Sequence, residues 1–258
     1  MNKSNVIQAN IDRFSGFTDL YNASRPVPPE IITEIILMYS PSLPELVIDI
    51  GSGTGLSTII WKDIARNAIG IEPNDDMRKT AQLSAPDIVF QDGYSNQTGL
   101  ADGCADIVTI SQAFHWMDIP TTLDEVYRVL KPGGVLAVYD CDWPPCVDWM
   151  VEQAENALIR KCNAVMPPAS KNDKSAHLRR LREYGRFAFV REAVCHSVEP
   201  CTPERMMGIA LSQGSVQGAL KVDASIQNDV DAFCDSVRER CPEHFDIVFS
   251  YRIRLAVK

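Results

Sequence analysis

Long apolar runs are missing from this 258-residue sequence. No stretch approaches the roughly 20 apolar residues that a helix needs to cross a bilayer. The first residues are polar and lack the apolar centre of a secretory signal peptide. We therefore expect a cytoplasmic protein that has no membrane partner.

Basic residues are also in deficit, because 25 Lys and Arg face 34 Asp and Glu, which gives a formal net charge of −9. A protein that binds the phosphate backbone of nucleic acid needs a basic surface. The composition therefore argues against a nucleic-acid partner. The basic stretch Arg179 to Arg182 is more simply interpreted as the solvent face of a helix.

The eight cysteines include no closely spaced pair of the kind that holds structural zinc. Cys141 and Cys146 lie too far apart in sequence for that pattern, and so do Cys195 and Cys201. The sequence predicts reduced thiols and no metal site. No internal repeat or low-complexity linker divides the chain, and its length suits one large α/β domain.

The most informative segment is an apolar strand that ends in a glycine-rich turn. Leu46 to Ile50 has the continuous apolar character of a buried parallel strand, and Gly51-Ser52-Gly53-Thr54-Gly55 follows. Glycines let the backbone approach a ligand closely because no Cβ intervenes. We expect a helix from about Leu56 to Arg66, whose N-terminus would face that ligand. The pattern indicates a nucleotide-type cofactor.

The spacing of the glycines narrows the choice of cofactor. A dinucleotide fingerprint, G-x-G-x-x-G, would have its third glycine at position 56, where the chain has Leu56. A phosphate-binding P-loop would require Lys followed by Ser or Thr, and this turn has neither. A tight turn without any ligand is the alternative interpretation.

An acidic residue follows the next apolar segment. Glu72 comes directly after Asn67 to Ile71 and lies 21 positions beyond Gly51. A carboxylate at this point can accept hydrogen bonds from both ribose hydroxyls of an adenosine group. A solvated carboxylate is the alternative. Pro73 ends the strand, and Asn74 is suited to cap a helix that runs to about Leu83.

Taken together, the motifs of the chain resemble the class I S-adenosylmethionine-dependent methyltransferases, in particular the small-molecule, methyltransferase type 11-like subgroup. The resemblance covers about residues 14–140. In family order, its motifs are Asp49-Ile50-Gly51-Ser52-Gly53-Thr54-Gly55, Glu72-Pro73, Gln91-Asp92-Gly93, Ser111-Gln112-Ala113-Phe114-His115-Trp116 and Leu130-Lys131-Pro132-Gly133-Gly134.

The resemblance implies an α/β fold with a Rossmann-like, doubly wound sheet of seven strands. The sheet would be mostly parallel, with a C-terminal antiparallel strand pair and a helical cap insertion. We expect one domain over residues 1–258. Residues 1–45 would form an N-terminal lid and first helix, residues 141–186 the helical cap, and residues 187–258 the C-terminal strands with intervening helices.

The resemblance also implies a binding site for S-adenosylmethionine, with S-adenosylhomocysteine as the product. Glycine-turn residues would surround the amino-acid part, Asp49 would help to hold its ammonium group, and Glu72 would bind the ribose. The expected cofactor residues are Phe14, Tyr21, Arg25, Asp49, Gly51, Ser52, Gly53, Gly55, Glu72, Pro73, Met77, Asp92, Gly93 and Gln112.

The adenine would lie between Met77 and the Asp92-Gly93 pair. Met77 would pack against the ring, the Asp92 carboxylate would accept from the exocyclic amine, and the Gly93 N–H would donate to a ring nitrogen. Two alternatives stay open, because a Met on a helix is often a core residue and Asp before Gly often forms an Asx turn.

The segment before the first strand resembles the family's lid over the cofactor. Within Phe14 to Pro26, Arg25 would pair with the cofactor carboxylate, since its planar fork can bind a carboxylate bidentately, and Tyr21 would cover the reaction centre. The segment has too few apolar positions to form a core of its own, so we expect the cofactor to order it. A surface Arg is the alternative interpretation.

Methyl transfer needs a base only when the acceptor carries a proton at neutral pH. His115 is the candidate general base, because it follows the fourth strand and the pKa of histidine lies near neutrality. Trp116 would form an aromatic wall for the substrate. Both residues could instead be structural and tie the strand end to the next helix.

The sequence thus predicts an enzyme that transfers a methyl group from S-adenosylmethionine to a small molecule by in-line displacement. A methyltransferase acting on a protein or peptide side chain is one alternative. A catalytically inactive, cofactor-binding partner subunit is the other.

Overall fold

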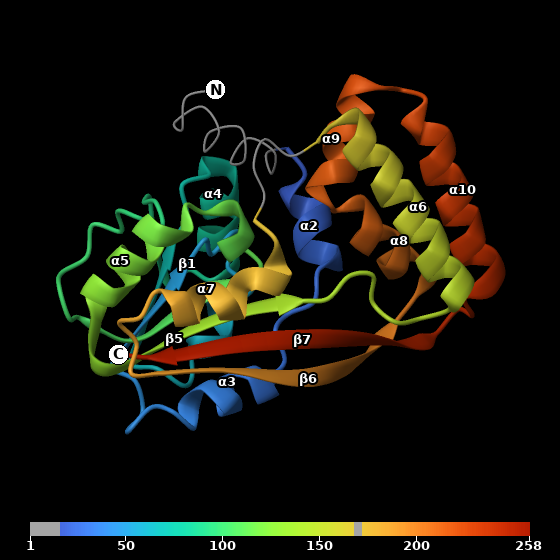
Figure 1. Cartoon of the computed structure of the whole chain (residues 1–258). Coiled ribbons are helices and arrows are strands. Elements are labelled where there is room, and N and C mark those ends of the chain that lie inside the picture. The colour runs from blue at the N-terminus through green and yellow to red at the C-terminus, as the bar shows by residue number, and fades with distance from the viewer. Residues whose placement is uncertain (1–15, 168–171) are drawn as a thin grey trace. The chain divides into compact units, whose positions relative to one another are not determined.

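The computed structural model describes residues 16–167 and 172–258. Its strands form one sheet in the order β3-β2-β1-β4-β5-β7-β6. Figure 1 labels β1, β5, β7 and β6 of this sheet. Strands β1 to β5 pair in parallel, and β7 runs antiparallel to β5. The predicted fold class is confirmed. The strands are β1 (Leu46–Ile50), β2 (Asn67–Ile71), β3 (Val89–Gln91), β4 (Ala105–Ser111), β5 (Leu130–Cys141), β6 (Phe189–Cys201) and β7 (Phe245–Val257).

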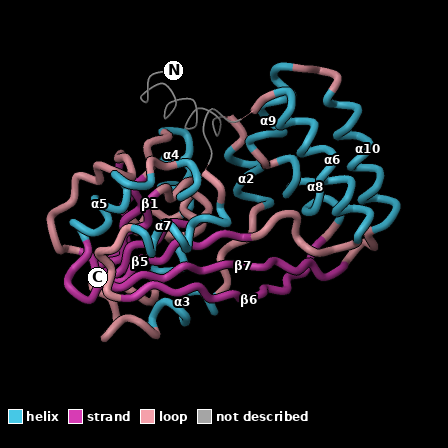
Figure 2. Tube along the Cα trace, in the orientation of Figure 1, coloured by secondary structure: helices cyan, strands magenta, loops and turns pink. Residues whose placement is uncertain are grey.

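Helices connect the strands and also form a group of their own after β5 (Figure 2). The α-helices are α2 (Thr18–Ser24), α3 (Glu30–Leu37), α4 (Asp75–Ser84), α5 (Ile119–Val129), α6 (Trp149–Val165), α7 (His177–Glu183), α8 (Pro203–Leu211), α9 (Gly214–Val222) and α10 (Ile226–Arg240). The 3₁₀ helices are η1 (Ile59–Trp61), η2 (Phe114–Trp116) and η3 (Lys174–Ala176).

The chain divides into two compact units. The sheet unit comprises Val27–Cys141, Ser170–Cys195 and Tyr251–Lys258, and the helical unit comprises Met1–Pro26, Asp142–Ala169 and His196–Ser250. Strands β6 and β7 contribute residues to both. The helical unit holds α2, α6, α8, α9 and α10. Whether residues 141–186 act as a cap over the sheet stays a prediction.

The sheet unit is held together by apolar packing of α5 and α7 on the strands. Helix α5 begins at a clear cap, because the Asp118 side chain accepts from the backbone N–H of Thr121. Its residues Leu123 and Val126 are buried in the same cluster as Ile48 of β1. Each such side chain stabilises the fold by roughly 1.5–3 kcal/mol.

The helix predicted from Leu56 to Arg66 is wrong, since this stretch consists of turns and the short η1. Two causes are visible. The hydroxyls of Ser57 and Thr58 donate to Asp49 rather than facing solvent. The run of β-branched residues that starts at Thr58 also has low helix propensity. A helix macrodipole therefore cannot be invoked at this turn, and ligand binding would depend on the turn's own backbone N–H groups.

Helix α2 has a packing partner within the helical unit, which differs from the expectation that only the cofactor would order it. The helix lies against α8 at Gly208, where any Cβ would clash with the Ser24 hydroxyl. Phe17, just before α2, is also buried. The chain itself therefore supplies contacts that order residues 17–24.

Candidate cofactor and active site

The glycine turn after β1 uses its three glycines for two different purposes. All three have positive φ, at 74° for Gly51, 56° for Gly53 and 87° for Gly55. A Cβ at Gly51 or Gly55 would come within 2.9 Å of a neighbouring side chain, so protein packing alone requires glycine there. At Gly53 the nearest atom would be Met77 Sδ, at an ordinary 3.5 Å. Gly53 is thus the position of the turn at which a ligand can approach the backbone.

Glu72 is fixed beside this open position. Its Oε2 accepts from the Gly53 N–H at 2.9 Å, and its Oε1 accepts from the Asn74 N–H at 2.8 Å. Burial raises the pKa of this carboxyl, while the two N–H donors act in the opposite direction. The alternative of a solvated carboxylate is therefore wrong. Each carboxylate oxygen keeps a second lone pair, so the two oxygens can still accept hydrogen bonds from two ribose hydroxyls. Pro73, which directly follows Glu72, is half-buried.

Two hydroxyl groups of the turn fit a polar ligand. Ser52 Oγ and Thr54 Oγ1 are buried, and neither has a hydrogen-bond partner among residues 16–167 and 172–258. A buried polar group without a partner costs roughly 1–3 kcal/mol. The charged amino-acid portion of S-adenosylmethionine carries donors and acceptors that would satisfy them. The turn therefore fits this cofactor.

Asp49 is an internal anchor of the turn. Its Oδ2 accepts from the hydroxyls of Ser57 and Thr58 at 2.7 Å each, and its Oδ1 accepts from the Thr109 hydroxyl at 2.8 Å. Burial raises the pKa of Asp49, and these three hydrogen bonds counteract it. The side chain is fully enclosed. Its contact with a cofactor ammonium group stays a prediction, whereas its bonds to three hydroxyls are part of the fold.

The residues predicted to bind adenine lie after β2 and β3. Met77 is buried in the first turn of α4, where its N–H donates to Asn74 Oδ1 and confirms the predicted helix cap. The Asp92 side chain is 70% exposed and lies 3.5 Å from Arg78. Gly93 has a packing reason to be glycine, since a Cβ there would come within 2.8 Å of a neighbouring side chain. Their contacts with adenine stay predictions.

Gln112 follows β4 and has an unusual backbone conformation. Its φ of 53° lies in the left-handed region, which non-glycine residues adopt at a cost. The Gln112 N–H donates to the carbonyl of Tyr139 at 2.9 Å, and its Oε1 accepts from Lys174 Nζ at 3.0 Å. Strand β5 and the first residue of η3 thus fix the end of β4.

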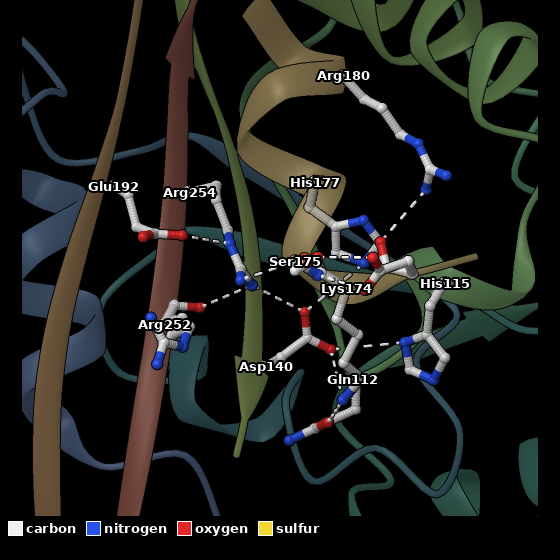
Figure 3. Close-up of polar contacts among 11 residues, drawn as sticks. Gln112, His115, Asp140, Lys174, Ser175, His177, Arg180, Glu192, Arg252 and Arg254 are labelled. Carbon is white, nitrogen blue, oxygen red and sulfur yellow. Dashed lines mark hydrogen bonds and ion pairs between the residues drawn. The ribbon is translucent and has the colours of Figure 1, made fainter. Parts of the chain in front are cut away.

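His115 and Trp116 lie side by side on η2, with ring centroids 4.9 Å apart. His115 is buried, and its Nδ1 lies 3.5 Å from Oδ1 of Asp140, near the end of β5 (Figure 3). Lys174 contacts the same carboxylate oxygen at 3.0 Å. Sequence reasoning missed Asp140, although it lies near the end of an apolar strand, as Glu72 lies just after one. No pattern in the sequence around Lys174 indicated that it would contact this carboxylate.

The predicted lid residues belong to the helical unit. Arg25 donates from Nε to the Ser212 hydroxyl at 2.9 Å and from Nη2 to the Ser212 carbonyl at 3.2 Å. Its guanidinium lies 5.0 Å from the ring centre of Tyr21 and 4.6 Å from that of Trp143. Phe14 lies outside the described residues. That these residues contact the cofactor stays a prediction.

Within the described part of the chain, no three His, Cys, Asp or Glu side chains are grouped so that they could hold a metal ion. The same residues include no helix with the length and apolar character required to span a membrane.

A parallel sheet that ends in an antiparallel strand, with a glycine turn after β1, defines a Rossmann-like protein. Residues 48–138 match the family described as "Methyltransferase domain". The chain is 31% identical over 126 residues to an uncharacterized methyltransferase of Mycobacterium tuberculosis, and this match covers 48% of this chain and 50% of that protein. It is 34% identical over 92 residues to the malonyl-[acyl-carrier protein] O-methyltransferase of Pectobacterium atrosepticum, which covers 35% and 36%.

The chain therefore spans half or less of the length of these curated relatives. Among solved structures, a protein from Anaeromyxobacter dehalogenans described as a type II methyltransferase has a TM-score of 0.67 at 20% identity. The match covers 90% of this chain and 97% of that one, and it shows the shared fold. Residues 48–138 thus match a methyltransferase domain, and the predicted resemblance to the class I S-adenosylmethionine-dependent methyltransferases is confirmed.

Proposed function

We propose that this chain transfers the methyl group of S-adenosylmethionine to a small-molecule acceptor. The observation that carries the proposal is the open position at Gly53. It lies beside the Glu72 carboxylate and between the buried hydroxyls of Ser52 and Thr54, which have no hydrogen-bond partner among the described residues. The methyltransferase family match supports the same cofactor. The net charge of −9 supports a small molecule over nucleic acid as the acceptor.

The residues of the turn would bind and orient the cofactor, which supplies an activated methyl group when bound. Glu72 would hold the ribose through its remaining lone pairs, and Ser52 and Thr54 would hydrogen-bond the amino-acid portion. Methyl transfer needs alignment of the two reactants more than covalent help. Well-oriented intramolecular reactions gain roughly 7–11 kcal/mol from such alignment.

Calorimetry with S-adenosylhomocysteine tests the proposal through Gly53→Ala. We expect roughly tenfold weaker binding or worse, equivalent to about 1.4 kcal/mol, because the new Cβ would occupy the ligand's place. Gly133→Ala is the matched control. Gly133 has a similar φ of 76°, and a Cβ added there would meet no atom within 4 Å, so the substitution carries comparable backbone strain but should leave binding unchanged.

Two results would contradict the proposal. One is tight binding of NAD with no response to S-adenosylhomocysteine. The other is wild-type affinity in a folded Gly53→Ala variant, which would mean that Gly53 serves the backbone turn alone.

A further inference from the structure

Asp140 is a buried carboxylate surrounded by four basic side chains (Figure 3). Its Oδ1 lies 3.0 Å from Lys174 Nζ and 3.5 Å from His115 Nδ1. Its Oδ2 lies 3.0 Å from Arg254 Nη1 and 3.9 Å from His177 Nε2. The two oxygens thus have separate partners, and it is Oδ1 that faces His115.

The carboxylate stays ionised although it is 1% exposed. Burial on its own raises the pKa of Asp140, but the nearby His115 ring and the charge of Lys174 hold it well below its usual value. Arg254 also pairs with Glu192 at 2.8 Å. Two fixed positive charges therefore balance two negative charges, and a proton on either histidine would be an added charge.

Nδ1 of the His115 ring faces the Asp140 carboxylate at 3.5 Å. The His115 carbonyl accepts from the Asn172 N–H at 2.7 Å, which fixes the backbone of η2. A neutral imidazole beside a carboxylate carries its hydrogen on the nitrogen that faces that carboxylate. Here that nitrogen is Nδ1, so Nε2 on the opposite side of the ring keeps its lone pair. Asp–His pairs divide the same roles in general base catalysis.

His177 contacts the same carboxylate but is excluded from this role. Its side chain is 0% exposed, whereas His115 is 4% exposed. Its Nε2 lies 3.9 Å from the carboxylate, whereas His115 Nδ1 lies 3.5 Å from it. Burial is the main cause that lowers the pKa of His177 to about 4, so this ring is neutral at working pH. His177 therefore serves as an internal control for His115.

We propose that Asp140 is a positioning residue that holds His115 in the Nδ1–H tautomer, so that Nε2 accepts the proton of a hydroxyl or amine acceptor. The inference rests on the proposed methyl transfer. The acceptor proton moves to Nε2, the freed electron pair forms the new bond to the methyl carbon, and the pair of the broken S–C bond stays on sulfur. The proton then passes from His115 to water. An alcohol, phenol or amine would need this step, whereas an acceptor that is already anionic would not.

Nitrogen-15 NMR of histidine-labelled protein tests the assignment without any methyl donor. The chain has only four histidines, so His115→Gln identifies the signal. We expect the Nδ1–H tautomer at His115 in the wild-type protein. In Asp140→Asn we expect mixed tautomers and a fall in the pKa of His115 by about one unit or more, because a neighbouring opposite charge is lost.

The single variant leaves Lys174 without its counter-charge, so Asp140→Asn combined with Lys174→Met is the charge-balanced test. His177→Phe is the matched control and should leave the tautomer and the titration of His115 unchanged. An Nε2–H tautomer in the wild-type protein would overturn the inference, and so would an unchanged, pure Nδ1–H tautomer in the folded double variant. If S-adenosylhomocysteine binds while the tautomer is Nε2–H, only this inference fails. If the tautomer is Nδ1–H but no S-adenosylhomocysteine binds, the proposed function fails.

Discussion

Glu155 makes the stability of the helical unit depend on pH. The residue lies on α6 and is 1% exposed. Its Oε1 accepts from Gln213 Nε2 at 2.8 Å, while Oε2 has no hydrogen-bond partner among the described residues. Burial raises the pKa of Glu155 to about 7, against the opposing charge of Arg25. The carboxyl group is therefore half protonated near neutral pH in the folded protein.

The direction and size of the effect follow from the two pKa values. In the unfolded chain the pKa is 4.5, so between 4.5 and about 7 the folded state binds more protons than the unfolded state. The stabilisation is complete below pH 4.5 and is lost as the pH rises through 7. A difference of about 2.5 units corresponds to roughly 3 kcal/mol in the free energy of unfolding.

Glu155→Gln tests this reasoning, because Gln keeps the acceptor for Gln213 but cannot ionise. At about pH 8 we expect the variant to be more stable than the wild type, by up to roughly 3 kcal/mol. At about pH 5 the two should agree to within roughly 1 kcal/mol. Urea denaturation followed by intrinsic tryptophan fluorescence, to which Trp143 and Trp149 of the same unit contribute, measures the difference.

The control is Glu239→Gln, which removes an exposed carboxylate from α10 of the same unit. It should shift stability by the same small amount at both pH values. A constant difference between wild type and Glu155→Gln from pH 5 to pH 8 would refute the reasoning, because it would mean that Glu155 titrates alike in the folded and unfolded chains.

Two further substitutions probe cofactor binding and packing. Glu72→Ala should weaken the binding of S-adenosylhomocysteine, as measured by calorimetry. It should also lower the free energy of unfolding by roughly 1–3 kcal/mol, since the N–H groups of Gly53 and Asn74 lose their acceptor. A variant that loses only affinity would show that water replaces the carboxylate. Gly208→Ala should cost roughly 1–3 kcal/mol, because the added Cβ clashes with Ser24 where α2 meets α8. Thermal unfolding measures the loss, and an unchanged melting temperature would show that α2 shifts freely.

Features with a local cause could be predicted from the sequence. The buried strand β1, the turn after it, and the Asn74 cap of α4 each depend on residues within a few positions of one another. The local pattern from Leu56 to Arg66 nevertheless predicted a helix that the bonds to Asp49 replace with turns. Tertiary contact thus overrode the local preference.

Features that join distant segments could not be predicted in this way. Asp140 meets Lys174 and His115 only after the sheet has formed, and no local pattern encodes the contact. The bond from Arg25 to Ser212 spans 187 positions. A lone Arg before Pro carries no information about such a partner, so the sequence could suggest a role for Arg25 but not its contacts.

The division of labour within the glycine turn affects how such a motif would decay during evolution. Gly51 and Gly55 are held by steric contact inside the protein, so a descendant that no longer used a cofactor would still need both in order to fold. Under the proposed function, selection on Gly53, Ser52 and Thr54 would relax first, because the bound cofactor would supply most of their constraint. In proteins built like this one, two intact glycines indicate only a correctly folded turn, and the middle position with its flanking hydroxyls is the better record of continued binding.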